Sequence, residues 1–295
     1  EDLAPGVPLG DVQEVSNYVA AMNYGLKRLR KDDFPLSLRL IREVHRVLLA
    51  KGRGNDKTPG EFRQTQNWLG GTRPGNARFV PPPPDHVADC MHNLEKFLHD
   101  QPQRTPVLLK AALAHVQFET IHPFLDGNGR LGRLLITLIL CAEDALAQPL
   151  LYLSLFFKQH RLEYYDRLDA VRLKGDWLGW LRFFLEGVEQ TAQQAADTAG
   201  RILKLFDEGY RRLEDLGRKA WSARRVLDLL RHHPITAIPN ATAQLNLTAP
   251  TVRSAVESLE TLGIVREISG RQRDRIYVYD HYVRILEQGT EPLQG

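Results

Sequence analysis

The densest group of polar side chains on an apolar background lies between His122 and Arg133. His122 is the one side chain in this stretch that titrates near neutral pH, which makes it the candidate general base. Asp126 offers a hard carboxylate oxygen of the kind that holds Mg²⁺ together with substrate phosphates. Arg130 and Arg133, at the start of a predicted helix, can both grip phosphate oxygens. Together these residue types indicate chemistry on a phosphate ester or anhydride.

The run Gly127-Asn128-Gly129 separates the carboxylate from the two arginines. Such a turn can bend so that its backbone N–H groups converge on an anion. The helix predicted to follow adds its unpaired N-terminal N–H groups and the positive end of its dipole. The sequence therefore predicts a base, a metal ligand and an anion cradle within one short segment.

A second pattern overlaps the first, because Gly127, Gly129 and Gly132 satisfy the dinucleotide-binding spacing GxGxxG. That fingerprint requires a preceding strand and an acidic residue about 20 positions later. Here a helical pattern precedes the glycines, and the nearest following acids, Glu143 and Asp144, come too early. The sequence also contains no GxxxxGK[ST] motif. We therefore exclude a dinucleotide-binding fold and a P-loop.

The segment resembles the Fic family signature, HxFx[D/E]GNGRxxR, at every defined position. The matching residues are His122, Phe124, Asp126, Gly127, Asn128, Gly129, Arg130 and Arg133. Residues 58–63, 67–84 and 162–165 also look like the corresponding parts of Fic proteins that carry a C-terminal winged-helix domain. The resemblance covers nearly the whole chain.

Most Fic enzymes transfer AMP from ATP to a hydroxyl group of a target protein, so the resemblance implies a protein adenylyltransferase, which is a nucleotidyltransferase. In that role His122 deprotonates a Ser, Thr or Tyr hydroxyl, and Asp126 holds the Mg²⁺ that bridges the α- and β-phosphates. Phe124 would fix the loop in the core. The implied nucleotide-binding residues are Gly127, Asn128, Gly129, Arg130, Leu131, Gly132, Arg133, Tyr164 and Tyr165.

The tyrosine pair has a competing interpretation, and Gly129 bears on which group is transferred. Tyr164 and Tyr165 look like the adenine end of the site, but a tyrosine pair can also be plain packing. Relatives that transfer phosphate have Lys where this chain has Gly129, so Gly129 favours AMP transfer. His115, on the helix that leads into the signature, is expected to be a core or capping residue.

A segment rich in glycine and proline, residues 67–84, looks like the family's flap. In the family this is a β-hairpin on which a target segment docks by strand addition. An ordinary surface loop is the alternative. The expected docking residues are Gly70, Gly71, Ala77, Arg78, Phe79 and Val80.

Helical periodicity dominates the first part of the chain. The predicted helices cover residues 11–22, 36–49, 86–99, 106–119, 130–145, 154–173, 176–194 and 197–216. The last part has predicted helices at 222–232, 240–245 and 250–262 and alternating strands at 264–268 and 275–279, in winged-helix order. We therefore expect a mainly α protein. A Fic-type helical bundle with a β-hairpin flap would occupy residues 1–216, and a small α+β winged-helix domain residues 217–295.

The composition of the chain excludes several classes of protein. With 43% hydrophobic and 25% charged residues over 295 positions, wholesale disorder is excluded. Two cysteines exclude a disulfide scaffold and a four-thiolate zinc site. The longest apolar run, residues 134–142, is far short of the ~20 residues that span a membrane. No export signal opens the chain, so we expect a cytoplasmic protein that does not bind membranes.

The winged-helix prediction leaves a second class of function open, a DNA- or protein-binding regulator whose Fic body does not transfer AMP. Arg271, Arg273 and Arg275 give the predicted wing a basic tip. The presumed recognition helix carries Glu257 and Glu260, which repel phosphates. The net charge of +3 is also too balanced to indicate nucleic acid. Protein contact or a homodimer is therefore favoured over DNA.

Many Fic proteins contain an inhibitory helix with the pattern [S/T]xxxE[G/N]. The Glu-Gly pairs at 186–187 and 208–209 lack the required residue four positions earlier. In relatives with this domain order the motif precedes a helix like 11–22, and the chain begins with Glu1 rather than Met. Either further residues precede Glu1, or the protein lacks inhibition within its own chain. We expect this chain to modify itself with AMP (auto-AMPylation) without inhibition.

Overall fold

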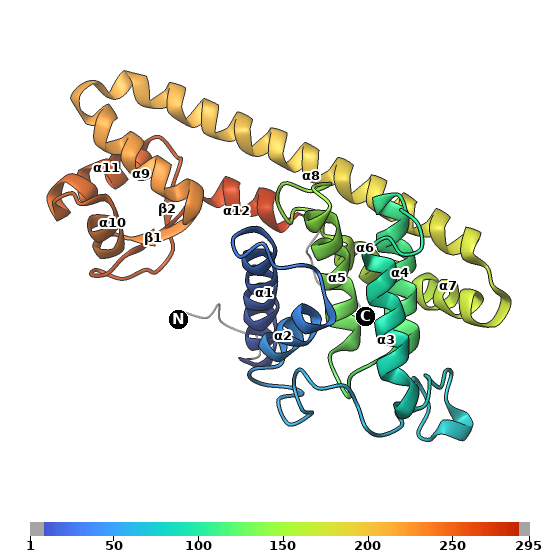
Figure 1. Cartoon of the computed structure of the whole chain (residues 1–295). Helices are drawn as coiled ribbons and strands as arrows, with labels where there is room; N and C mark the ends of the chain where they lie inside the picture. The colour runs from blue at the N-terminus through green and yellow to red at the C-terminus, as the bar shows by residue number, and fades with distance from the viewer. Residues whose placement is uncertain (1–8, 289–295) are drawn as a thin grey trace. The chain divides into compact units, whose positions relative to one another are not determined.

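Helix α5 (Asn128–Ala142) is buried along most of its length, and the helices of the first unit pack around it (Figure 1). Its apolar run from Leu134 to Ala142 explains this, because a helix that is apolar on all sides is stable only inside a core. The computed structural model describes residues 9–288. The other helices of this unit are α1 (Leu9–Arg30), α2 (Leu38–Leu48), α3 (Pro84–Leu98), α4 (Val107–Ile121), α6 (Leu153–Gln159), α7 (Arg161–Lys174) and the first part of α8 (Trp177–Leu213).

Helices α4 and α5 pack against each other and are joined by residues 122–127. Helix α4 is itself largely buried, from Lys110 to Ile121. Helices α1 and α2 pack on another side of α5. The short connection that carries most of the signature therefore lies at the end of two buried, well-supported helices.

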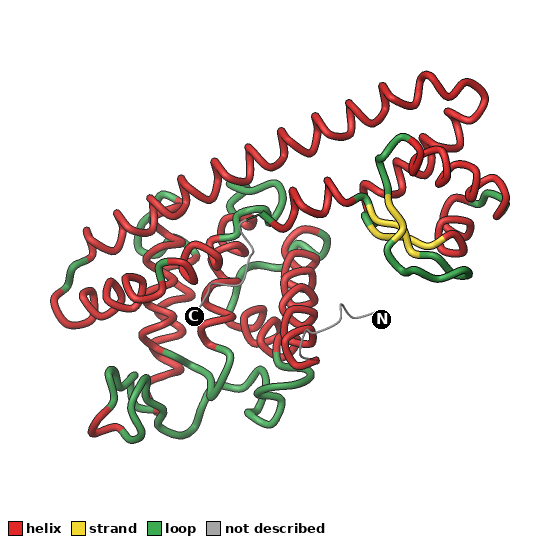
Figure 2. Tube along the Cα trace, turned by 180° about the vertical axis from the view of Figure 1, so that it is seen from behind, coloured by secondary structure: helices red, strands yellow, loops and turns green. Residues whose placement is uncertain are grey.

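The second unit contains a small antiparallel sheet in the strand order β1-β3-β2, shown in yellow in Figure 2. Thr236 of β1 pairs with Tyr277 of β3, and Glu267 of β2 pairs with the same residue from the other side. The strands β2 and β3 lie inside the predicted ranges 264–268 and 275–279. The elements after α8 are the 3₁₀ turn η2 (Glu214–Lys219), α9 (Ala220–His232), β1 (Ile235–Ala237), α10 (Ile238–Leu245), α11 (Ala249–Thr261), β2 (Arg266–Glu267), β3 (Ile276–Val278) and α12 (Asp280–Glu287).

The two compact units divide between Thr191 and Ala192, inside α8, rather than at the expected position between 216 and 217. The second part of α8 belongs to the second unit because Phe206 and Leu213 are buried in that unit's core. Residues 1–8 and 289–295, the ends of the two predicted domains, lie outside the described residues. The identification of the second unit as a winged-helix domain stays a prediction.

Two helix predictions were wrong in their connectivity. The separate helices expected at 176–194 and 197–216 form one continuous helix, α8. The residues between them are rich in Ala and Gln and contain no proline, so nothing ends the helix there. The single helix expected at 154–173 is two helices, α6 and α7, which meet at His160. Within the part of the chain that the structure describes, no helix is long and apolar enough to cross a bilayer.

Candidate active site

His122 caps the C-terminus of α4 in a left-handed backbone conformation, with φ 49° and ψ 60°. Its backbone N–H donates to the carbonyl of Phe118 at 2.9 Å. A residue other than glycine seldom adopts this conformation, and it does so where the surrounding structure holds it. Contacts from distant parts of the chain supply that support.

Arg63 is one source of this support, and it is buried, with only 2% of its surface exposed. Its Nε donates to the carbonyl of His122 at 3.0 Å, and its backbone N–H donates to the carbonyl of Pro123 at 2.9 Å. The guanidinium also donates to the carbonyls of Thr65 and Pro82. One side chain therefore ties the loop after α4 to both ends of the segment predicted as the flap.

His45 on α2 supports the other side of the same loop. Its Nδ1 accepts the backbone N–H of Gly60 at 2.8 Å, which leaves the ring proton on Nε2. The Nε2–H then donates to the carbonyl of Asp126 at 2.9 Å, and the ring stacks on Phe124 with 3.8 Å between centroids. His45 was missed from the sequence. The available signal was a histidine on the apolar face of α2, between Val44 and Leu48.

The side chain of Asn128 forms its hydrogen bonds within the loop. Its Oδ1 accepts the N–H of Phe124 at 2.9 Å, and its Nδ2 donates to the carbonyl of the same residue at 2.8 Å. Gly127 has φ +79°, and a Cβ there would lie 3.2 Å from His45 Nε2, so the position requires glycine.

The first turn of α5 leaves backbone donors free for an anion. The N–H of Leu131 makes the first bond of the helix, to the carbonyl of Gly127 at 2.9 Å. The N–H groups of Asn128, Gly129 and Arg130 precede it and have no partner within the helix. Their position matches the anion cradle expected from the sequence, which stays a prediction.

Asp126 and the two signature arginines lie beside this cradle. Asp126 Oδ1 accepts the N–H of Gly127 at 2.6 Å, whereas Oδ2 only approaches Arg53 Nε at 3.8 Å. Arg130 lies 3.9 Å from Asp126 and pairs with Glu14 of α1 at 3.3 Å. Arg133 folds back along the helix, so that a Cβ at residue 129 would lie 3.3 Å from its Nη1. The glycine at 129 thus leaves room beside this guanidinium.

The ring of His122 is mostly enclosed, with 16% of its side chain exposed. Burial lowers its pKa to about 4, against the opposing effect of the nearby Glu119 carbonyl. His122 is therefore neutral at pH 7 and can accept a proton. Its Nδ1 atom is buried and has no hydrogen-bond partner, so the accessible edge of the ring is the Nε2 side.

Because three histidines are buried, we expect the free energy of unfolding to depend on pH. Burial lowers the pKa of His45 and of His122 to about 4, and that of His115 to about 3. In the unfolded chain each takes up a proton near pH 6.5. Below that pH the unfolded state binds more protons, so the free energy of unfolding falls as the pH drops toward 4.

We expect a loss of about 2 kcal/mol per histidine at pH 5, partly offset by Glu119, whose pKa is raised by burial. Urea unfolding at pH 7 and pH 5 measures this difference. An unfolding free energy that does not change over this interval would contradict it.

Tyr164, Leu131 and Gly132, which were predicted to bind the nucleotide, are core positions, and Gly127 and Asn128 are buried as well. Tyr164 is 3% exposed, and its hydroxyl lies 2.9 Å from His115 Nε2, so its ring is not available to stack on adenine. His115 is buried, as expected. Leu131 is buried with its N–H used by the helix, and Gly132 packs against Glu119. Tyr165 is 41% exposed, and the guanidiniums of Arg78 and Arg161 lie 6.0 Å and 5.9 Å from its ring centroid.

The predicted β-hairpin over residues 67–84 is a loop with a single antiparallel bridge, between Leu69 and Phe79. A short 3₁₀ turn, η1 (Pro74–Asn76), forms its tip. Gly71 has φ +70°, and a Cβ there would collide with the carbonyl of Asn76 at 2.3 Å. Prolines at 81–84 stop the pairing because proline lacks an N–H donor.

The flap is attached to α7 by its second half. Arg78 forms ion pairs with Asp166 and Asp169, and Arg172 lies over the ring of Phe79 at 4.2 Å from the centroid. These contacts place Arg78 and Phe79 beside α7, next to Tyr165. The second half of the flap therefore lies beside α7, next to the exposed Tyr165.

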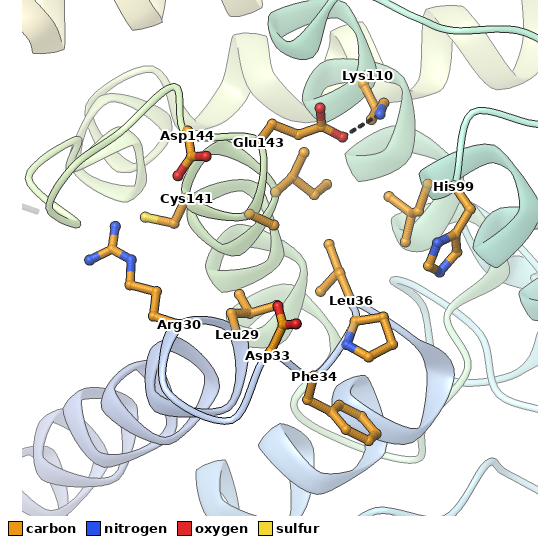
Figure 3. Close-up of a pocket in the computed structure, with 14 residues that line it drawn as sticks. Leu29, Arg30, Asp33, Phe34, Leu36, His99, Lys110, Cys141, Glu143 and Asp144 are labelled. Carbon is orange, nitrogen blue, oxygen red and sulfur yellow. Dashed lines mark hydrogen bonds and ion pairs between the residues drawn. The ribbon is translucent and has the colours of Figure 1, made fainter.

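A separate pocket of about 530 Å³ lies at the opposite, C-terminal end of α5 (Figure 3). It is lined by charged residues that include Arg30, Lys110 and Glu143. Lys110 is buried and pairs with Asp100 at 2.9 Å and with Glu143. Helix α5 separates this pocket from the catalytic loop by about 20 Å. It is not part of the candidate site.

Residues 35–140 match the family model described as the Fic/DOC family. The chain is similar to this family over that segment. It is 34% identical over 188 residues to the protein adenylyltransferase Fic of Aedes aegypti, across 63% of this chain and 34% of that protein. It is 30% identical over 192 residues to the protein adenylyltransferase fic-1 of Caenorhabditis elegans. The chain spans about a third of the length of these curated relatives.

Solved structures share the fold of this chain. A Fic family protein from Desulfovibrio desulfuricans superposes with a TM-score of 0.56 at 21% identity, over 95% of this chain and 77% of that one. Fic-1 from C. elegans, residues 134–508, superposes with a TM-score of 0.51 at 26% identity. That match covers 68% of this chain and 55% of the other. The predicted Fic helical fold is therefore confirmed.

Proposed function

We propose that this protein transfers AMP from ATP to a Ser, Thr or Tyr hydroxyl group of a target protein. The observation that carries the proposal is the loop between α4 and α5. It presents a neutral histidine, a carboxylate and a set of free backbone N–H groups within one turn of chain. The relatives named protein adenylyltransferase support the same chemistry.

In the proposed reaction, the target hydroxyl gives its proton to His122 Nε2 as its oxygen attacks the α-phosphorus of ATP. The bond from the α-phosphorus to the bridging oxygen breaks, and pyrophosphate leaves with the electron pair. The free N–H groups at the start of α5, together with Arg130 and Arg133, stabilise the negative charge on the phosphates. No covalent step on the protein is required, so positioning and charge carry the catalysis.

The residues present fit a Mg²⁺ ion bound jointly by the protein and ATP. Asp126 Oδ2 accepts no hydrogen bond, and the side chain is 29% exposed. Among the described residues no group of three or more His, Cys, Asp or Glu side chains surrounds a point, so the protein alone would not hold a metal. Mg²⁺ commonly binds one carboxylate and substrate phosphates. Bound there, the ion would neutralise charge on the phosphates.

The proposed partner is an extended segment of a target protein, or of a second copy of this chain. Arg63 holds the flap next to the loop of His122, and the Leu69–Phe79 bridge joins the two halves of the flap. Val80, at the end of the bridge, is 43% exposed. A segment that pairs with the flap by backbone hydrogen bonds would bring its hydroxyl side chain toward His122 whatever its sequence.

The test of this function compares ATP labelled at the α-phosphate with ATP labelled at the γ-phosphate, in cell lysate and with the purified protein alone. We expect protein-bound label only from α-labelled ATP, and EDTA should abolish it. Label from γ-labelled ATP would indicate a kinase instead. Absence of label from both would refute the proposed function. Label on the purified protein would reveal auto-AMPylation.

The second unit favours contact with protein over contact with DNA. Arg271, Arg273 and Arg275 are exposed between β2 and β3, but α11 exposes Glu257 and Glu260. Since phosphate contacts supply much of DNA affinity, this mixed surface is poorly suited to DNA. The winged-helix assignment, a homodimer and a cytoplasmic location remain predictions from the sequence.

A further inference from the structure

The proposed general base and a residue next to it each have a buried polar atom without a hydrogen-bond partner. They are His122, through Nδ1, and Glu119 of α4, through Oε1. Glu119 is 5% exposed, and its Oε2 lies 4.0 Å from His122 Nδ1. A buried polar atom that makes no hydrogen bond costs stability, so such a pair indicates a function beyond packing.

The surroundings of Glu119 accommodate a carboxylate in this position. A Cβ at Gly132 would lie 2.3 Å from Glu119 Oε1, so only glycine on α5 leaves space for the side chain. Burial raises the pKa of Glu119, while the positive charges of Arg133 and Arg172 lower it. Among the described residues, no lysine or arginine lies within ion-pair distance of the carboxylate, and its near neighbour His122 is neutral. The Glu119 carboxylate therefore forms no ion pair with an arginine among these residues.

Which nitrogen of the His122 ring carries the hydrogen decides what Glu119 can do. Only the Nε2 side of His122 is accessible, so Nε2 must be unprotonated to take the proton from the target hydroxyl. The neutral ring then carries its hydrogen on Nδ1, and this N–H needs an acceptor. The carbonyl of Glu119 already accepts from Arg172 Nη2 at 3.0 Å. The acceptors near Nδ1 are this carbonyl, which has a second lone pair, and the Glu119 carboxylate.

We propose that Glu119 is a positioning residue for His122, and this inference rests on the proposed function. Its carboxylate accepts the Nδ1–H, which keeps Nε2 unprotonated in the resting enzyme. When Nε2 takes the proton of the target hydroxyl, the ring becomes an imidazolium, and the same carboxylate stabilises its positive charge. Glu119 takes up no proton itself. The arrangement uses the general principle by which a carboxylate orients a catalytic histidine.

The test replaces Glu119 with glutamine, which keeps the size of the side chain but removes its charge. We expect kcat for AMP transfer to fall by about 10- to 100-fold, with the KM for ATP unchanged. Glu186→Gln, an exposed position on α8, is the matched control and should retain the wild-type rate. Thermal melting of both variants shows that each is folded.

A second measurement does not depend on transfer. Long-range ¹H–¹⁵N NMR spectra at pH 7 show which ring nitrogen of His122 carries the hydrogen, with His122→Ala providing the assignment. We expect Nδ1–H in the wild type and a larger Nε2–H population in Glu119→Gln. A wild-type ring protonated on Nε2 would overturn the inference, and so would an unchanged kcat in Glu119→Gln. A wild type that transfers no AMP would instead refute the proposed function, while the NMR result would stand.

Discussion

His122→Ala is expected to lower the rate of AMP transfer by about 10²–10⁴-fold, the contribution of a general base. ATP binding should persist, because the phosphate-binding groups lie on the first turn of α5 and do not include the imidazole ring. The loop should keep its shape, since Arg63 and Asn67 contact the carbonyl of residue 122 and not its side chain. Single-turnover transfer from α-labelled ATP, with nucleotide affinity measured separately, tests both expectations.

The control for this variant is His86→Ala, which removes an exposed histidine of α3. It should transfer AMP at the wild-type rate. Equal rates in the wild type and His122→Ala would remove His122 from the mechanism. Loss of both transfer and ATP binding would show that the ring supports the nucleotide site and is not only a base.

Arg63→Ala is expected to combine a large loss of stability with a loss of transfer. The carbonyls of His122, Thr65 and Pro82 would each lose a charged donor, and so would the buried carbonyl of Ile121. We expect destabilisation by about 3 kcal/mol or more. Transfer should fall about 10²-fold even in folded protein, since small displacements of reacting groups cost this much. Urea unfolding and single-turnover transfer measure the two effects.

Arg63→Lys should recover only part of the stability and of the transfer rate. A guanidinium reaches carbonyls on several sides at once, and the compact ammonium group of lysine does not. Arg182→Ala, at an exposed position of α8, is the control for loss of an arginine. An Arg63→Ala protein with wild-type stability and rate would show that the loop after α4 does not depend on this link.

The contiguous part of the site was predictable from the sequence because its geometry is local. A turn followed by a helix places the N–H groups of residues 128–130, the Asp126 carboxylate and the Arg130 guanidinium close together whatever surrounds them. The same holds for the helices, whose periodicity reports which face is buried. It also holds for β2 and β3, whose alternating residues match the hairpin in the second unit.

The residues that hold this segment in shape were not predictable in the same way. His45 and Arg63 reach the loop from positions about 60–80 residues earlier in the chain, and Glu119 gains its meaning only when Gly132 packs against it. Hydrogen bonds between distant side chains and backbone leave no periodic pattern in a sequence. Conversely, Tyr164 looks suited to a base but is enclosed by its neighbours on α4 and α8.

The sequence by itself thus determined the local geometry of residues 122–133 and the helical class of the fold, since both follow from short-range spacing. Only the tertiary structure decided which ring of the tyrosine pair is exposed, that the flap pairs through a single bridge, and that α8 continues into the second unit. It also decided which nitrogen of His122 is accessible. These properties depend on burial and on contacts across the fold, which arise only when distant segments pack together.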